Sequence, residues 1–511
     1  MAASLYDKMI NWDSRLGREI PVISSYFADL GENATIFDVC CSSGRHSLAL
    51  NHLGFQTVGV DISASFIDFA RQLSQDNHTA EIAEFVEIDA SDKEMIRKFK
   101  GRYFDGAILL GNAIANMGNF TKGQQLIRNI FTLLRPGAKF FVQTVNKPEK
   151  PWYNPLRGKD GVIIQRIMVP EPIGPDSEQQ HNVVLHVNQL RAEPLEYVSQ
   201  KADNLFFMYR LDEFQTLVER TGFQVENVYS GYTKAEVEDI DGETLIWQLR
   251  KPEIELLPEG EALFSKYTGM TAEQVKSATL TIWQDLLLEQ WYHCIRGCRF
   301  LYPRITAHPR YEEFVRLTKQ GPILDIACFI GTDLRQLWVD GARQLHGIDI
   351  SAVFIDSGKQ LFEGNMQDQT LEKADIEFSV ADITTDNFLS VTTETDNYAI
   401  SGDFARYYNF FAGIHAGSLL HLLTEDQVQV VLQRVYHMLR KDGIFFGRAV
   451  GSSTPKPIEN HFRFLHSIDS LRSTFNDVGF SEVDVFAMPQ SGPKGESSTS
   501  TNLQLGFFVK K

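Results

Sequence analysis

A segment that occurs twice constrains this 511-residue sequence more than any other feature. Residues 61–73 read DISASFIDFARQL and residues 349–361 read DISAVFIDSGKQL, so nine of thirteen positions match at an offset of 288 (349 − 61). Before each copy, an apolar run containing an Asp enters a loop of small residues, at 36–44 and at 323–331. Two matched segments at nearly one spacing indicate a duplicated structural unit rather than chance.

Each copy has the alternation of strands and helices that is typical of a parallel α/β unit. The first copy predicts strands near 35–40, 56–60, 84–88, 104–110 and 139–143, with helices at 44–53, 64–74 and 121–134. The second copy repeats the order, with strands near 322–327, 345–348, 376–380, 410–415 and 443–448. The sequence therefore predicts an α/β fold with two Rossmann-like domains in tandem.

Two segments lie outside this pattern. Residues 150–210 combine prolines with alternating apolar residues, which predicts antiparallel strands inserted after the fifth strand as a cap over a substrate. Residues 260–320 have a mostly helical pattern and lead into the second copy. Because the run 252–258 is acidic and flanked by prolines, we expect a domain boundary there, with domains at 1–252 and 253–511.

Both copies place the same kinds of residue after their first three strands. Small residues follow strand one, where a ligand can approach the backbone and the next helix N-terminus. Asp61 and Asp349 follow strand two and are suited to accept hydrogen bonds from ribose hydroxyls. Asp89 and Asp382 follow strand three and can accept a hydrogen bond from an adenine amino group beside apolar neighbours. This order predicts a nucleoside site, although each Asp can instead cap the segment that follows it.

The nucleoside can belong to a dinucleotide or to S-adenosylmethionine. Neither copy has the G-x-G-x-x-G spacing of a dinucleotide site or a Walker lysine. Residues 38–46 (DVCCSSGRH), 60–63 (VDIS), 104–112 (FDGAILLGN) and 133–137 (LLRPG) resemble the motifs of class I S-adenosylmethionine-dependent methyltransferases. Residues 210–223 resemble that family's last helix and strand, so the resemblance covers most of residues 10–250.

The second half of the chain resembles a narrower group, the fungal-type methyltransferases of secondary metabolism. That group includes enzymes that methylate carboxyl and hydroxyl groups in polyketide and meroterpenoid pathways. The likeness runs from about residue 263 to 487 and is carried by several separated motifs, namely 267–270 (YTGM), 293–301, 324–335, 415–422 (HAGSLLHL) and 447–451 (GRAVG). The resemblance implies methyl transfer from S-adenosylmethionine to an oxygen of a natural-product intermediate.

The resemblance also implies a cofactor-binding set in each copy. The set in the first copy is Asp38, Cys40, Gly44, Asp61, Ile62, Asp89, Ala90, Gly111 and Asn112. The set in the second copy is Asp325, Ala327, Gly331, Asp349, Ile350, Asp382 and Ile383. Cys40 and Ala327 lie in loops where many relatives carry glycine, so a degenerate copy that is retained only for packing is the alternative.

Two histidines are the candidates for catalysis. His415 and His421 lie at and after the end of the second copy's fourth strand, where a histidine can take a proton from an acceptor hydroxyl. The alternative is that His415 lines the cofactor pocket and His421 packs or caps a turn. The first copy has no titratable group there, and Asn112 can orient an acceptor or satisfy local backbone. The N-terminal segment can close over the cofactor through Tyr6, Trp12 and Arg15.

Composition excludes several functional classes. With 49 basic and 66 acidic residues the net charge is −17, which argues against nucleic-acid binding. No run of about 18 apolar residues is present and the N-terminus lacks a signal-peptide pattern, so we expect no membrane span and a cytoplasmic location. Five cysteines do not indicate a disulfide framework. His293, Cys294 and Cys298 lack a fourth partner at zinc-like spacing, so we expect no metal site.

Together these features predict a tandem methyltransferase with S-adenosylmethionine as cofactor and small molecules as acceptors. The second domain is expected to O-methylate a carboxyl or hydroxyl group, and the first to add a second methyl group at nitrogen or oxygen. The alternative from a different class is a non-catalytic regulator or scaffold that binds S-adenosylmethionine. A nicotinamide-dependent oxidoreductase is a third, less favoured interpretation. The sequence does not predict the oligomeric state.

Overall fold

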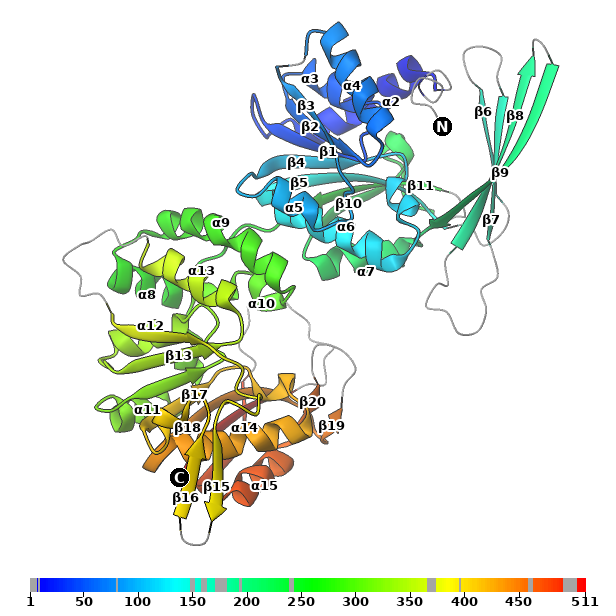
Figure 1. The fold of residues 1–511 in the computed structure, drawn as a ribbon. Coiled ribbons are helices and arrows are strands. Elements are labelled where there is room, and N and C mark those ends of the chain that lie inside the picture. The colour runs from blue at the N-terminus through cyan, green and yellow to red at the C-terminus, as the bar shows by residue number, and fades with distance from the viewer. Residues whose placement is uncertain are drawn as a thin grey trace. The chain divides into compact units, whose positions relative to one another are not determined.

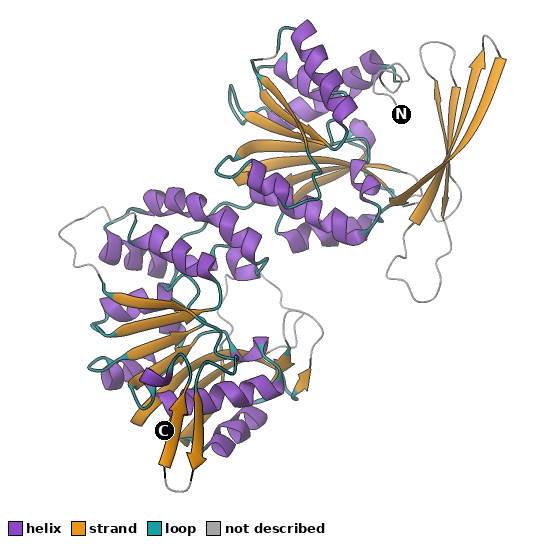
Figure 2. Cartoon of the chain, in the orientation of Figure 1, coloured by secondary structure: helices purple, strands orange, loops and turns teal. Residues whose placement is uncertain are grey.

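The computed structural model describes residue 7 and residues 10–79, 81–147, 152–157, 163–170, 182–192, 195–238, 243–364, 374–394, 397–457, 463–489 and 503–511. Between residues 152 and 205 only the backbone is described. The chain divides into two compact units, Met1–Ile254 and Glu255–Lys511 (Figure 1). Each unit contains a seven-stranded sheet flanked by helices (Figure 2), which confirms the predicted pair of α/β domains.

The sheet of the first unit has the strand order β10-β11-β5-β4-β1-β2-β3. Strand β1 pairs in parallel with β2 on one side and with β4 on the other. The chain therefore runs outward from β1 to β3 and returns on the other side of β1, and ligands of parallel sheets bind at such a reversal. The strands are β1 (Thr35–Val39), β2 (Gln56–Asp61), β3 (Ala83–Glu87), β4 (Phe104–Leu109), β5 (Leu134–Val145), β10 (Gln224–Ser230) and β11 (Thr244–Arg250).

Helices cover both faces of this sheet (Figure 2). Helix α2 (Trp12–Phe27) begins after Asn11, whose side chain accepts a hydrogen bond from the Ser14 backbone N–H. Its apolar face, which includes Ile23 and Phe27, is buried in one cluster with strand residues. The other helices are α3 (Arg45–Asn51), α4 (Ala64–Asp76), α5 (Glu94–Lys98), α6 (Phe120–Leu133) and α7 (Leu211–Thr221).

The sheet of the second unit repeats this topology as β14-β13-β12-β17-β18-β22-β21. The register repeats as well: Ile36 of β1 pairs with Gly106 of β4, and Ile323 pairs with Gly413. Positions at the carboxyl ends of the strands can therefore be compared one by one between the two units. The strands are β12 (Ile323–Ile326), β13 (Leu345–Asp349), β14 (Ile376–Val380), β17 (Phe411–Ala416), β18 (Leu439–Gly451), β21 (Ser481–Met488) and β22 (Leu503–Lys510).

The second unit begins with the predicted helical lead-in. Helix α9 (Ala272–Glu289) starts with a capping box formed by Thr271 and Gln274, and it packs against α13 (Ala352–Phe362). The remaining lead-in helices are α8 (Pro258–Thr268), α10 (His293–Arg296) and α11 (Tyr311–Thr318). The helices of the core are α12 (Thr332–Val339), α14 (Glu425–Met438) and α15 (Ile468–Val478).

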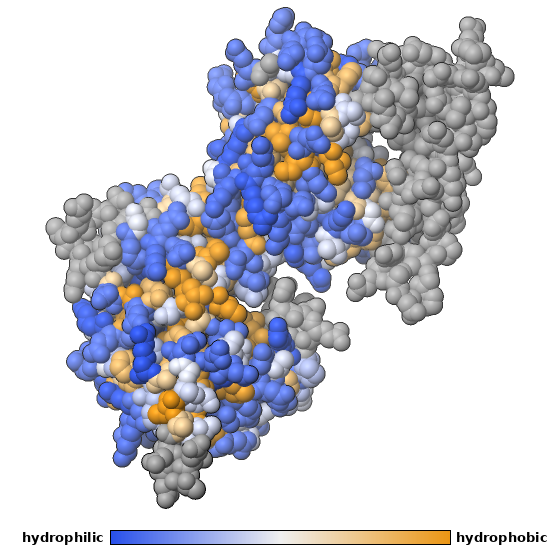
Figure 3. Space-filling view, viewed as in Figure 1, coloured by the Kyte–Doolittle hydropathy of each residue, from blue (hydrophilic) through white to orange (hydrophobic). Residues whose placement is uncertain are grey.

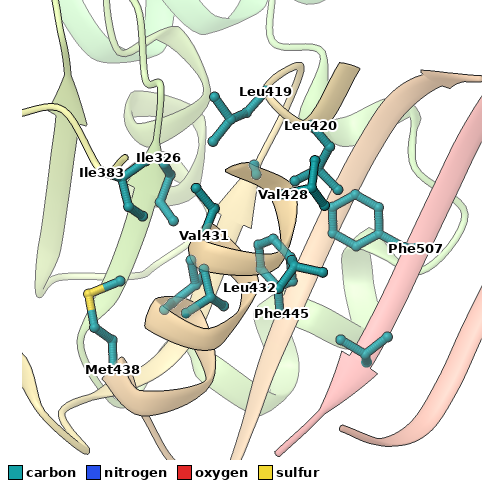
Figure 4. Packing of buried hydrophobic residues seen from close by; sticks show 14 of the residues in the cluster. Ile326, Ile383, Leu419, Leu420, Val428, Val431, Leu432, Met438, Phe445 and Phe507 are labelled. Carbon is teal, nitrogen blue, oxygen red and sulfur yellow. The ribbon is translucent and has the colours of Figure 1, made fainter. Parts of the chain in front are cut away.

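The second unit also contains an antiparallel hairpin, β15 (Ser390–Glu394) with β16 (Asn397–Ser401), that the sequence analysis missed. Its strands are rich in threonine and serine and show no apolar alternation, so the period-2 signal of a half-buried strand is weak. A large apolar cluster packs α14 against the sheet. Figure 4 shows Val428, Val431 and Leu432 of α14 in this cluster together with Ile326 and Phe445 of the sheet, and all five are buried.

The predicted cap is a four-stranded antiparallel sheet, β6 (Trp152–Arg157), β7 (Ile163–Pro170), β8 (Asn182–Ala192) and β9 (Leu195–Phe207). The chain leaves the first unit after β5 and re-enters it before α7. The two ends are held together there, because the Lys147 backbone N–H donates to the Tyr209 carbonyl at 3.1 Å and the Leu211 N–H donates to Asn146 Oδ1 at 3.1 Å. The two ends of the cap thus lie together at the first unit, and β9 also contacts the 3-10 turn η1 (Ala113–Met117).

The visible surface of both units is mostly hydrophilic, with apolar residues gathered in smaller patches (Figure 3). Within the described ranges, no helix combines the length and the apolar character that a bilayer crossing requires.

Candidate functional site

The loop after the first strand has the same unusual backbone in both units. Alternate residues adopt positive φ angles in the left-handed region, which glycine occupies readily and other residues occupy at a cost. This explains why glycine suits these positions and why the side chains here add strain. The angles are 58° at Cys40, 49° at Ser42, 73° at Gly44, 56° at Ala327, 54° at Phe329 and 75° at Gly331.

The last residue of each loop must be glycine for a second reason. A Cβ atom on Gly44 would lie 2.8 Å from the Phe85 ring, and one on Gly331 would lie 2.8 Å from the Phe378 ring. Both rings come from the third strand of their sheet, in which they cover the loop from the side. Close packing of loop and strand therefore fixes the backbone that begins α3 and α12.

The acid after the second strand has the same two partners in each unit. Asp61 accepts hydrogen bonds from the backbone N–H groups of Ser42 at 2.9 Å and Ser63 at 3.0 Å. Asp349 accepts from Phe329 at 2.9 Å and Ser351 at 3.0 Å. Burial raises the pKa of both carboxyl groups, and these N–H donors counteract that rise.

The capping alternative for these two acids can be compared with the structure. The N-cap residues of α4 and α13 are Ser63 and Ser351, two positions after Asp61 and Asp349. Both acids thus lie outside the N-cap position, and each accepts one hydrogen bond from the loop and one from the N-cap residue.

Exposed apolar side chains adjoin both acids. Ile62 is 67% exposed and Ile350 is 68% exposed, although the same residue types are normally buried. One strand further, Asp89 accepts from the backbone N–H of Ser91 at 2.8 Å, and Asp382 accepts from Thr384 at 2.8 Å. The neighbouring Ala90 and Ile383 are buried. Each unit therefore offers polar acceptors next to an uncovered apolar face, which fits a ribose and an aromatic base.

The acid within the first strand is where the two units differ. Asp38 accepts a hydrogen bond from Ser47 Oγ at 2.6 Å, and burial raises its pKa to about 6. Asp325 instead lies 2.8 Å from Nδ1 of His415, and burial raises its pKa while His415 lowers it. Both acids are only 3% exposed. The hydrogen bond to the buried carboxyl group thus comes from helix α3 in the first unit and from strand β17 in the second.

The side-chain amides of Gln143 and Asn112 form hydrogen bonds around the end of β4 in the first unit. The Gly111 backbone N–H donates to Gln143 Oε1 at 2.9 Å, and the Tyr232 hydroxyl donates to the same oxygen at 3.0 Å. Asn112 has a φ of 56°, and its Oδ1 accepts from the Val145 backbone N–H at 3.1 Å. Asn112 therefore satisfies local backbone, and no titratable side chain follows β4 directly.

A buried carboxylate beneath this end of the sheet was missed by the sequence analysis. Glu19 of α2 is bound by His46 Nε2 at 2.8 Å, Arg18 at 2.9 Å and Arg15 at 3.2 Å. Although burial alone would raise its pKa, these partners lower it to about 2. The spacing of four residues between Arg15 and Glu19 on one helix was the available signal. Trp12 packs edge-on against His46, and Tyr6 lies outside the described residues.

Two arginines occupy the corresponding place in the second unit, and the sequence analysis did not single them out. Val142 pairs with Leu109 and Gly447 pairs with Ala416, so Gln143 and Arg448 follow at equivalent positions. Arg448 is 4% exposed, and its Nε donates to the Gly417 carbonyl at 3.0 Å. Burial, with the nearby Arg304 guanidinium, lowers the pKa of Arg448 to about 9, so it stays cationic at neutral pH.

The two candidate catalytic histidines are both buried. His421 accepts a hydrogen bond from the Val450 backbone N–H at 3.3 Å, and burial with the Arg304 and Arg448 cations lowers its pKa to about 3. His421 is therefore neutral at pH 7 but a weak base. The His415 side chain is 3% exposed and directed at Asp325. The structure thus places both histidines near the strand end, with neither side chain open to solvent.

Among the described residues, the cysteines and other potential metal ligands form no metal-binding cluster. All five cysteines are free thiols, and burial raises the pKa of the Cys40 and Cys41 thiols. Across the ranges that the structure describes, no group of three His, Cys, Asp or Glu residues is arranged to hold a metal ion.

Comparison with known proteins shows that this chain is similar to methyltransferases. The family model described as a methyltransferase domain matches residues 36–137. The chain is 30% identical over 216 residues to Methyltransferase adrK of Penicillium roqueforti, covering 41% of this chain and 73% of that protein. It is 38% identical over 90 residues to Methyltransferase ausD of Penicillium brasilianum, covering 17% of this chain and 32% of that protein. It is 25% identical over 156 residues to a demethylmenaquinone methyltransferase of Leptospira interrogans, covering 29% and 59%.

Proposed function

Because the chain belongs to the class I S-adenosylmethionine-dependent methyltransferases, we propose that it has two competent sites for two different methyl transfers. The second domain O-methylates a carboxyl group of a small natural-product intermediate. The first domain methylates another small-molecule position, at nitrogen or oxygen. S-adenosylmethionine is the cofactor of this enzyme.

The observation that carries the proposal is the repeated geometry of the two cofactor sites. Asp61 and Asp349 bind equivalent backbone N–H groups at distances that agree within 0.1 Å (2.9 and 3.0 Å in each). In each unit the acid and the exposed isoleucine stand at equivalent positions beside the loop, where both can contact a nucleoside. Both units keep both features.

The residues fit the cofactor by the chemistry of their donors and acceptors. We assign the ribose hydroxyls to Asp61 and Asp349, the adenine edge to Asp89 and Asp382, and the adenine faces to residues including Ile62 and Ile350. The remaining assigned residues line the loop and strand ends: Asp38, Cys40, Gly44, Ala90, Gly111, Asn112, Asp325, Ala327, Gly331 and Ile383. When bound, S-adenosylmethionine supplies a methyl group activated by its sulfonium. The protein contributes alignment and exclusion of water, which can lower a barrier by about 7–11 kcal/mol.

The charge at the acceptor end favours a carboxyl over a hydroxyl acceptor in the second domain. A hydroxyl must lose its proton, and a base with a pKa of about 3, as at His421, is poorly matched to that task. A carboxylate is already ionised and needs no base. Arg304 and Arg448 place two guanidinium groups close together there, and guanidinium pairs well with carboxylate. In the first domain the neutral Gln143 stands at the position of Arg448. An uncharged acceptor therefore suits the first domain as well as a carboxylate does.

Calorimetric titration with S-adenosylhomocysteine tests whether both sites are competent. Two sites per chain are expected, one lost in Asp61→Ala and the other in Asp349→Ala. The matched controls are Asp68→Ala and Asp356→Ala, because these acids lie at equivalent exposed positions on α4 and α13. A single site would show that one copy is degenerate, and no binding at all would contradict the proposal.

The regulator or scaffold alternative is separated from catalysis by a transfer assay. A tritiated methyl donor is supplied with a panel of carboxylic acids, phenols and amines. We expect label in a carboxylic acid, lost in Asp349→Ala and retained in Asp356→Ala. Binding of S-adenosylhomocysteine at both sites without any transfer would favour the regulator. Label only in phenols would refute the carboxyl assignment while leaving methyl transfer intact.

A further inference from the structure

We propose that His415 is a positioning residue of the second cofactor site, where it holds Asp325 as Ser47 holds Asp38 in the first. The proposal rests on the proposed function, because it takes the second site as competent. It replaces the role of general base, which the position of His415 at the end of β17 had suggested.

The register of the two sheets shows that the hydrogen-bond donor has moved. Asp38 pairs across the sheet with Gly59 and Ile108, whereas Asp325 pairs with Gly347 and His415. His415 therefore stands where the first domain has Ile108. The third residue after the loop glycine is Ser47 in the first domain and Leu334 in the second. Each domain thus has one hydrogen-bond donor and one apolar residue next to the acid, and the positions of the two are exchanged between the domains.

A buried carboxyl group without a donor is costly, so this exchange has a physical reason. Ser47 Oγ lies 2.6 Å from Asp38 and His415 Nδ1 lies 2.8 Å from Asp325, and both acids are 3% exposed. The carboxylate accepts, so Nδ1 of His415 carries the hydrogen. Each domain supplies the acid with one side-chain donor from a different element. Two independent solutions to one problem indicate that the acid itself is required.

The surroundings of His415 also separate it from an acceptor. Its ring is 5.6 Å from the Phe446 ring, and a Cβ atom on Gly417 would come within 3.1 Å of its Cε1. The side chain is therefore enclosed between β18 and the turn after β17. A general base must come within hydrogen-bond distance of the proton it removes, and the His415 ring, at 2% exposure, is covered where an acceptor would have to approach it.

The acid lies close to the groups that we assign to the cofactor. Asp325 is two residues before Ala327 in the loop, and its pKa is raised mainly by burial and further by nearby charges that include Asp349. Asp38 is likewise influenced by Asp61. A change in the donor of the first-strand acid is therefore expected to alter cofactor binding at its own site.

The experiment compares His415→Asn with His415→Leu. An Asn amide can donate to Asp325 from nearly the place of Nδ1 but cannot act as a base, whereas Leu removes the donor. We expect His415→Asn to bind S-adenosylhomocysteine at the second site within about threefold of wild type and to keep methyl transfer. We expect His415→Leu to weaken that binding about tenfold or more.

The first domain provides the matched control. Ser47→Ala removes the donor to Asp38 and should weaken the first site by a similar factor, whereas Ser47→Thr should not. If His415→Leu fails to fold, His415→Asn and the Ser47 pair still decide the question. Loss of transfer in His415→Asn with normal binding would identify a base and overturn the proposal, as would wild-type binding in both His415→Leu and Ser47→Ala. Absence of a second site in the wild-type protein would instead contradict the proposed function.

Discussion

The two domains agree where the nucleoside is expected and differ where the acceptor is expected. Asp61 and Asp349 share partners and distances, and the loops before α3 and α12 share their positive φ angles. Near the ends of β5 and β18, however, the first domain has Gln143 where the second has Arg448. The proposed nucleoside sites thus share backbone donors and repeated acids, whereas the proposed acceptor ends differ in the side chains at positions 143 and 448.

The largest expected difference between the domains is their response to acid. Burial lowers the pKa of His308 and His421 to about 3 and of His466 to about 4, in each case below the unfolded value of about 6.5. The unfolded state binds these protons more tightly, so the stability of the second domain is full above pH 6.5 and falls below it. At pH 5 each histidine should cost about 2 kcal/mol.

The first domain should respond later. The pKa of Glu19 is lowered to about 2, so its contribution to stability is lost only below about pH 4.5. The raised pKa of Asp38, about 6, has the opposite effect and favours the folded state as pH falls, and the raised pKa of Asp325 acts in the same direction in the second domain. Thermal unfolding followed from pH 7 to pH 5 should therefore separate into two transitions, with the second domain unfolding first. His308→Phe should reduce the pH dependence by about a third; earlier unfolding of the first domain would contradict this comparison.

The next largest effect is expected for Arg448→Gln, which gives the second domain the residue of the first. Loss of a buried cation that pairs with a carboxylate acceptor should lower kcat/KM for that acceptor about 100-fold. Binding of S-adenosylhomocysteine at the second site should change less than about threefold, because the nucleoside partners lie at other strands. Gln143→Arg is the reciprocal control and should leave transfer by the second domain unchanged. Unaltered kcat/KM in Arg448→Gln would remove the charge argument for the acceptor.

A smaller difference is expected at the helix starts. The Ser351 side chain accepts from the Phe354 backbone N–H at 3.3 Å and donates to Glu289 at 2.7 Å, whereas the Ser63 side chain caps nothing on α4. Ser351→Ala should lower the free energy of unfolding by about 1–2 kcal/mol. Ser63→Ala should lower it by less than about 0.5 kcal/mol. Urea unfolding measures both, and equal losses would show that the second cap contributes nothing special.

The smallest effect should be the same in both domains. Ala327→Gly and Cys40→Gly each relieve a residue with positive φ, and each should raise the free energy of unfolding by up to about 1 kcal/mol. Urea unfolding of the two variants provides the comparison. Opposite signs would mean that the two loops are not under equivalent strain.

The sequence predicted the parts of this structure that local patterns encode. The repeat at 61–73 and 349–361 indicated both sheets and the acids after their second strands, because alternating strands and helices are typical of parallel α/β units. It could not predict that His415 meets Asp325, since 90 residues separate them and only the pairing of β12 with β17 brings them together. The contact between Glu19 and His46 could not be predicted either, because it also depends on tertiary packing. Arg448 was present in a quoted motif, but its burial beside Arg304 depends on tertiary packing.

The way in which the cap joins the first domain has a consequence for how this chain can change. Lys147 and Tyr209 are already joined across the base of the inserted segment by a backbone hydrogen bond. This contact already brings the two ends of the segment together. Each doubling of the segment's length would therefore raise the free-energy cost of closing the loop by only about 0.6 kcal/mol. The length of the insertion before the end of β9, which contacts η1 (Ala113–Met117), can therefore change at little cost in free energy. The insertion is the part of this domain whose length the fold constrains least.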